Sequence, residues 1–123
     1  MKNSLFSIFL FIILLTYTDI SFKNLCSEVI LKCEEMEKNI DSLSKEENFE
    51  KAMDIYNLIE DKGKLAAIYV NHLDYDVMLN EALKLTVYIE RDDYGESDAS
   101  LHLLKSSTEH MKELQVPNIE NIF

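Results

Sequence analysis

The sequence predicts an all-α protein, with an N-terminal transmembrane helix followed by an antiparallel four-helix bundle. Three observations predict this class. Residues 5–15 are apolar apart from Ser7, later stretches carry apolar residues at intervals of three and four, and the chain has only two Gly and one Pro. The spacing is that of helices, and the scarcity of turn residues disfavours a β-sandwich.

The first segment, residues 1–23, has the features of a signal anchor. Lys2 precedes the apolar run, and residues 5–22 are just long enough to cross a bilayer. No Ala-x-Ala-like triplet follows for signal peptidase, and residues 23–25 put no small residue before Cys26 for lipoprotein processing. We expect an uncleaved single-pass anchor with the acidic domain outside the cytoplasm, and secretion after cleavage is the alternative.

Residues 24–43 are predicted to form the first helix of the bundle, which spans residues 24–116. Its apolar seam alternates by three and four: Cys26, Val29, Cys33, Met36, Ile40 and Leu43. We expect the seam to face the core of the bundle, and the alternative is a parallel coiled coil between two anchored chains. Cys26 and Cys33 lie about 10.5 Å apart on one helix, too far to bridge each other. They are therefore buried in the seam or form an intermolecular disulfide.

The second helix is predicted at residues 45–70. Ser44 and Glu47 form a capping-box pattern at its start, and Gly63 is the point where it ends or bends. Asn71 or His72 then ends this helix and starts the next, because Asn is a good cap. The predicted inward face is Phe49, Ala52, Met53, Tyr56 and Ile59.

The third and fourth helices are predicted at residues 73–91 and 96–114. The charged stretch at residues 91–95, ending in Gly95, separates them, and Pro117 stops the chain from continuing as a helix. The third apolar face is Tyr75, Met78, Leu79, Ala82, Leu85, Thr86 and Ile89. The fourth is Ala99 or Ser100, Leu103, Leu104, Ser107, Met111 and Leu114.

The charge and the polar residues restrict the function. A net charge of −11 disfavours nucleic acid or an anionic lipid surface as the main partner, because both would be repelled. His102 and His110 lie eight residues apart, not the three or four that place two metal ligands on one side of a helix. The residues indicate no cofactor, metal or catalytic set. A sensor or enzyme pocket around Asn71, His72 and His110 remains as the alternative to a binding module.

Residues 51–93, "KAMDIYNLIEDKGKLAAIYVNHLDYDVMLNEALKLTVYIERDD", and the closing "SLHLLKSSTEHMKELQVPNIENIF" resemble domain-of-unknown-function family 4363. The resemblance rests on Asn71-His72, on the run from Leu85 to Ile89, which contains Tyr88, and on the tail Glu120-Asn121-Ile122-Phe123. The departure is Gly63, where members commonly carry Trp, and it predicts looser packing there. The resemblance implies small membrane-anchored helical proteins of low-GC Gram-positive bacteria, encoded beside multi-pass membrane proteins, with no enzyme activity.

The expected function is therefore a non-enzymatic accessory module that binds a multi-pass membrane protein or itself. The interaction or structural candidates are Asn71, His72, Tyr88, Glu120, Asn121, Ile122 and Phe123. The tail, residues 117–123, is expected to dock on the bundle, because a solvated tail would expose its Ile and Phe side chains. The alternative is that the tail is a peptide that binds the partner.

Overall fold

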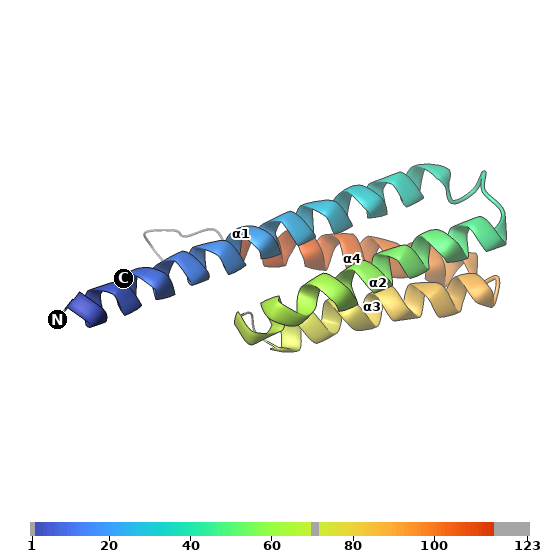
Figure 1. The fold of residues 1–123 in the computed structure, drawn as a ribbon. Helices are drawn as coiled ribbons and strands as arrows, with labels where there is room; N and C mark the ends of the chain where they lie inside the picture. The colour runs from blue at the N-terminus through green and yellow to red at the C-terminus, as the bar shows by residue number, and fades with distance from the viewer. Residues whose placement is uncertain (1, 70–71, 115–123) are drawn as a thin grey trace.

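A computed structural model describes residues 2–69 and 72–114, and this part of the chain forms four α-helices (Figure 1). Their bounds are α1 Lys2–Asn39, α2 Lys45–Tyr69, α3 His72–Glu90 and α4 Tyr94–Leu114. Successive helices are antiparallel and pack side by side, and α4 also packs against α1, which closes a four-membered ring. The predicted all-α bundle with a long apolar N-terminal helix is confirmed.

The predicted membrane segment and the first bundle helix are one helix. Helix α1 continues across the predicted boundary at residues 23 and 24, and neither Gly nor Pro interrupts it. An ion pair of 3.0 Å between Lys23 and Asp19 supports the helix at this point. Phe22 is only 1% exposed, so the core of the bundle begins slightly before the predicted boundary. The first part of α1 projects beyond the other three helices (Figure 1).

The second half of α1 supplies one side of the core. Its buried side chains are Phe22, Leu25, Cys26, Val29, Cys33 and Met36. These include most of the predicted seam, and helices α2 and α4 of the same chain pack against α1. The prediction that the seam faces the core is thus confirmed. The alternative coiled coil through this seam is wrong, because the chain's own helices already cover it.

Helix α2 passes through Gly63 without ending there. The ring of Tyr75 on α3 lies directly against Gly63, in the space that a Cβ atom would occupy. Its hydroxyl donates a hydrogen bond of 3.1 Å to the carbonyl oxygen of Ile59. The prediction of looser packing at Gly63 is wrong: glycine here admits an aromatic ring from the neighbouring helix.

The buried faces of α2 and α4 match the predicted ones in part: Ala52 and Ile59 on α2, and Ser100, Leu104 and Met111 on α4, are buried as predicted. Helix α2 buries Asn48, Ala52, Ile55 and Ile59, with Phe49 and Tyr56 only partly buried. Helix α4 buries Ser97, Ser100, Leu101, Leu104, Thr108 and Met111, whereas Leu103 is 52% exposed. The third predicted face is confirmed, with Leu79 partly buried. On α4, Ser97 and Thr108 face the core together with Leu101 and Leu104, whereas the predicted Leu103 does not.

Two of these buried hydroxyls, Thr108 and Ser97, are compatible with the core because each donates to a backbone carbonyl oxygen four residues earlier. Thr108 donates to the carbonyl oxygen of Leu104 at 2.6 Å, and Ser97 donates to that of Asp93 at 2.7 Å. A buried hydroxyl that keeps a hydrogen bond avoids most of the cost of losing water. Hydrophobicity alone therefore does not identify Ser97 and Thr108 as part of the buried face of α4.

Both described turns at the end of the bundle away from the N-terminus carry specific caps. The amide of Glu47 donates to the Ser44 side chain at 3.2 Å, which confirms the predicted start of α2. After α3, the amides of Asp92 and Asp93 donate to the carbonyl oxygens of Ile89 and Tyr88, a Schellman motif. Asp92 takes the left-handed conformation, with φ of 57°, a position usually held by glycine. Gly95 lies inside α4 instead.

Candidate functional site

The exposed first half of α1 is the most unusual surface of the molecule. The window of highest hydropathy has a mean hydropathy of 2.0 and is 6% buried, and the helix is long and apolar enough to cross a membrane. Soluble domains rarely expose a continuous apolar surface of this kind. The exposed side chains are Leu5, Phe6, Ile8, Phe9, Leu10, Phe11, Ile12, Ile13, Leu14, Tyr17 and Ile20.

The polar groups in this half of α1 are mostly satisfied locally. The hydroxyls of Ser7 and Thr16 donate to the carbonyl oxygens of Asn3 and Ile12, each at 2.8 Å. Thr18 donates to the carbonyl oxygen of Leu15 at 2.9 Å. Hydroxyls that bond the preceding turn remain compatible with a hydrocarbon environment, where water is absent.

A groove lies where the exposed half of α1 meets the bundle. It has a volume of about 450 Å³ and lies between α1 and the last part of α2. Apolar and charged side chains share its walls, so it has the mixed character of a membrane–water boundary. Its lining residues are Tyr17, Thr18, Ser21, Phe22, Asn24, Leu25, Glu28, Asp61 and Lys62.

Ion pairs in this groove and beyond it join α1 to its two neighbours. Lys62 on α2 pairs with Glu28 at 3.4 Å, and Lys51 pairs with Glu35 at the same distance. On the other side of α1, Lys105 of α4 lies 3.3 Å from Glu37 and also contacts Glu34. Exposed pairs of this kind each contribute at most about 1 kcal/mol, so they align the helices more than they stabilise them.

The two cysteines are free and fully buried, with 0% of each side chain exposed. Burial raises the pKa of each thiol from 9.0 to about 12, and the carboxylate of Glu37 adds to the effect at Cys33. Protonated, enclosed thiols are poor nucleophiles. The predicted intermolecular disulfide therefore does not fit the folded bundle, because neither sulfur reaches a surface that a second chain could contact.

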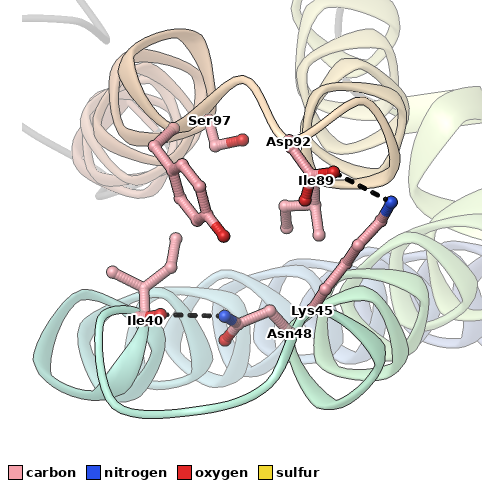
Figure 2. Close-up of a pocket in the computed structure, with 7 residues that line it drawn as sticks. Ile40, Lys45, Asn48, Ile89, Asp92 and Ser97 are labelled. Atoms are coloured by element: carbon pink, nitrogen blue, oxygen red, sulfur yellow. Dashed lines mark hydrogen bonds and ion pairs between the residues drawn. The ribbon is translucent and has the colours of Figure 1, made fainter.

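A small pocket with both apolar and polar side chains lies at the end of the bundle away from the N-terminus (Figure 2). Asn48 is 3% exposed, and its amide nitrogen donates to the carbonyl oxygen of Ile40 at 2.8 Å, while its Oδ1 atom has no protein partner. Beside it, Lys45 pairs with Asp92 at 3.2 Å. The cavity holds about 10 Å³, close to the space of a single water molecule. Its polar groups join the α1–α2 turn to the α3–α4 turn.

Of the residues predicted as a possible pocket, only His110 has a side chain within the described part of the structure. His110 is exposed on α4, as is His102. Tyr88 is half-buried on α3, and its carbonyl oxygen accepts the Schellman hydrogen bond from Asp93. Helix α2 ends at Tyr69 and α3 begins at His72, so the change of helix falls where it was predicted.

Several predicted candidates lie outside the described residues. These are Asn71, the side chain of His72, and the C-terminal residues Glu120, Asn121, Ile122 and Phe123. Docking of the tail at residues 117–123 lies outside them too. The capping role of Asn71 or His72 and the two alternatives for the tail stay predictions.

The acidic residues of the α3–α4 turn have structural partners. Asp93 accepts the amide of Glu96 at 3.1 Å as the N-cap of α4, and Asp92 pairs with Lys45. Within residues 2–69 and 72–114, no three His, Cys, Asp or Glu side chains gather closely enough to hold a metal ion. The turn acids thus cap and connect helices.

Asn48 is a buried polar residue of the pocket that the predicted face of α2 does not include. It lies next to Phe49, whose stronger apolar character predicts that the inward face starts there. The available signal was the spacing of Asn48, Ala52, Ile55 and Ile59, which repeats by three and four. A polar residue in phase with such a stripe indicates a buried hydrogen bond.

Comparisons with known proteins give one match. The model of the family described as "Domain of unknown function (DUF4363)" matches residues 16–122. No curated protein matches, and no solved structure matches. The matched region begins inside the exposed part of α1 and continues through all four helices.

Proposed function

The chain belongs to the family Domain of unknown function (DUF4363), and from this premise we propose that it is a membrane-anchored, non-enzymatic helical module that binds another membrane protein or itself. The observation that carries the proposal is the continuity of α1. One helix holds an exposed apolar half and a half whose side chains form the core of the bundle. A chain built this way positions its folded domain at a fixed height beside the membrane.

The length of the exposed half fits a bilayer. The residues from Lys2 to Ser21 rise about 30 Å as a helix, which equals the thickness of the hydrocarbon core. Charged residues fall at both ends of this stretch, with Lys2 at one end and the Asp19–Lys23 pair at the other. Tyr17 lies near the second end, where aromatic side chains favour the interface.

An uncleaved anchor is supported by the structure around the nearest cleavage-like triplets. Residues 16–18 and 19–21 lie within the continuous helix, and Phe22 directly after them is buried in the core. Cleavage there would leave a new charged amino terminus beside a buried aromatic ring. Retaining the segment keeps the helix whole.

A non-enzymatic role is supported by the structural use of the buried polar groups. Asn48 fixes the carbonyl of Ile40, Tyr75 fixes that of Ile59, and Thr108 bonds within its own helix. Both cysteines are protonated and enclosed. Each of these groups is enclosed in the bundle and has a structural role, which supports a role through contact rather than catalysis.

For the partner we propose a multi-pass membrane protein or a second copy of the chain. Anchoring confines the module to the plane of the membrane, where weak contacts gain from a high effective concentration. The net charge of −11 favours basic protein surfaces over nucleic acid or anionic lipid. Lys2 at the amino end favours an extracytoplasmic position for the bundle.

Membrane fractionation combined with intact mass measurement tests the anchor. We expect the full 123-residue chain in the membrane pellet after alkaline carbonate washing, with the bundle accessible to protease from outside intact spheroplasts. A shortened chain that begins after residues 16–22 and is found in the soluble fraction would show cleavage and secretion instead.

Affinity capture from detergent-solubilised membranes tests the binding function. A C-terminally tagged chain should retain a multi-pass membrane protein or a second, differently tagged copy of itself. The matched control is a chain of the same length with Leu14→Arg, which weakens insertion. Capture of neither class by the unmodified chain would contradict the proposal.

A further inference from the structure

The outer face of α1 carries a second seam, which the bundle leaves exposed. It starts in the apolar half, continues past Phe22 and alternates by three and four. Its members are Phe6, Leu10, Ile13, Tyr17, Ile20, Asn24, Ser27 and Leu31. The six apolar members are between 48% and 65% exposed, Asn24 is exposed and Ser27 is half-buried.

This outer seam lies opposite the core seam. Leu31 is turned about 200° around the helix from Val29, which is fully buried. Leu31 itself is 65% exposed although it lies beside the bundle rather than in the apolar half. Helix α1 therefore has two seams with the same period. One is occupied by α2 and α4, and the other is exposed, with Tyr17 and Asn24 at the edge of the groove beside α2.

The residues of the outer seam fit a parallel pair of identical helices. Two chains anchored in one membrane have the same direction, so their α1 helices meet in parallel. With Asn24 and Leu31 at a positions, Ser27 occupies a d position and Tyr17 and Ile20 continue the pattern. A single Asn at an a position fixes the register of a parallel pair. Ser27 is small enough to let the helices approach closely.

The charges beside the outer seam are complementary between two copies. In this register Lys23 occupies a g position and Glu28 the e position five residues later. These two positions face each other across a parallel pair, and the twofold axis repeats the contact. Their side chains are 28% and 44% exposed, so both reach the surface while contacting Asp19 and Lys62 in their own chain.

We propose that two copies of the chain associate in parallel through the outer seam of α1, from the membrane segment to Leu31. This inference rests on the proposed membrane anchoring and names the partner as a second copy. The core seam is unchanged by the association, so each bundle folds before it pairs. The dimer places two acidic bundles side by side at the membrane surface.

Cysteine cross-linking in membranes tests the seam. The unmodified chain is the blank, because its two thiols are enclosed. Single Asn24→Cys and Leu31→Cys variants should give a disulfide-linked dimer on mild oxidation, with at least fivefold more product than two controls. The controls are Lys32→Cys, turned about 100° from Leu31, and Ser106→Cys, exposed on α4. Equal yields at all four positions, or no dimer at any, would overturn the proposal.

A second measurement does not depend on introduced thiols. Sedimentation of the full chain in detergent micelles should give a dimer for the unmodified chain, and Leu31→Asp should raise the dimer dissociation constant at least tenfold. The melting of the bundle should not change in this variant, because Leu31 is exposed. A monomer at all concentrations overturns the inference while leaving anchoring intact, whereas a chain lost from carbonate-washed membranes overturns the anchoring.

Discussion

The two halves of α1 belong to the same helix but depend on different surroundings. Up to Ser21 the helix is apolar on all sides and exposed, with Phe11 60% exposed. From Phe22 onward it alternates, and one face is buried while charged residues occupy much of the rest. The same backbone geometry therefore serves a membrane segment and a bundle helix, and only the distribution of apolar side chains distinguishes them.

Because of this difference, the second half of α1 determines the stability of the bundle and the first half determines the location of the protein in the membrane. A buried side chain in the second half stabilises the bundle through contacts with α2 and α4. An exposed apolar side chain in the first half contributes to transfer into lipid and has few contacts within the protein. Identical substitutions in the two halves should thus have separable effects.

The largest expected effect comes from the phenylalanine pair. Phe22→Ala should lower the free energy of unfolding of the bundle by about 3–5 kcal/mol, because it removes a buried ring and leaves a cavity. Phe11→Ala, the same change in the exposed half, should alter it by less than about 0.5 kcal/mol. Chemical unfolding in micelles, followed by circular dichroism, measures both. Equal losses would mean that the bundle extends into the first half.

A charged substitution in the first half of α1 should change membrane insertion and not the stability of the bundle. Leu14→Arg should weaken membrane insertion by roughly 2.5–3.5 kcal/mol, the cost of a charged side chain near the centre of a span. The bundle should unfold as in the unmodified chain, because Leu14 is 58% exposed. Carbonate extraction measures insertion, with Leu14→Ala as the control. Full retention of Leu14→Arg in membranes would argue against a spanning helix.

A substitution at Asn48 tests how much the hydrogen bond to the carbonyl oxygen of Ile40, just after the end of α1, stabilises the bundle. Asn48→Ala should destabilise the bundle by about 1–3 kcal/mol, because the carbonyl of Ile40 loses its buried hydrogen bond. Insertion should not change, since the site lies at the opposite end of α1 from the exposed half. Asn57→Ala is the matched control, because Asn57 is exposed on α2, the helix that also carries Asn48. A loss no larger than that of the control would show that water replaces the amide.

The smallest effect at neutral pH concerns the thiols of the second half. Their folded pKa of about 12 lies above the ordinary 9.0, so their contribution to stability is complete below pH 9 and is lost as the pH rises toward 12. At pH 8 we expect alkylation of the folded bundle to be at least 100-fold slower than in denaturant. Ser106→Cys, exposed on α4 and outside the outer seam, is the positive control. Rapid alkylation of Cys26 or Cys33 at pH 8 would contradict the enclosed core.

Much of the fold could be predicted because periodicity and caps are local. Ser44 starts α2 as its side chain predicts, and the stripe of α3 was complete. The predictions of packing and burial are wrong where the role of a residue depends on residues that are distant in the sequence but close in space. The role of Gly63 becomes visible only when Tyr75 packs against it. Thr108 can lie in the core because its hydroxyl donates to the carbonyl oxygen of Leu104, while Leu103 is exposed.

The candidate site was less predictable. The apolar run predicts the exposed half of α1, but its continuity with the bundle depends on the absence of a break near Lys23. The cysteines illustrate the limit most clearly. The spacing of Cys26 and Cys33 fits an intramolecular core and an intermolecular contact equally, and only the packing of α2 and α4 shows that the core encloses them.

Site-directed spin labelling along α1 tests the central claim most directly. Labels placed singly at exposed positions from Leu10 to Leu31, in lipid vesicles, report contact with oxygen in the bilayer and with a water-soluble relaxer outside it. We expect one unbroken helical period through residues 18–24, with the change from lipid to water near Ser21. A loss of the period or a shift of its phase at residues 18–24 would show two separate elements and contradict the account.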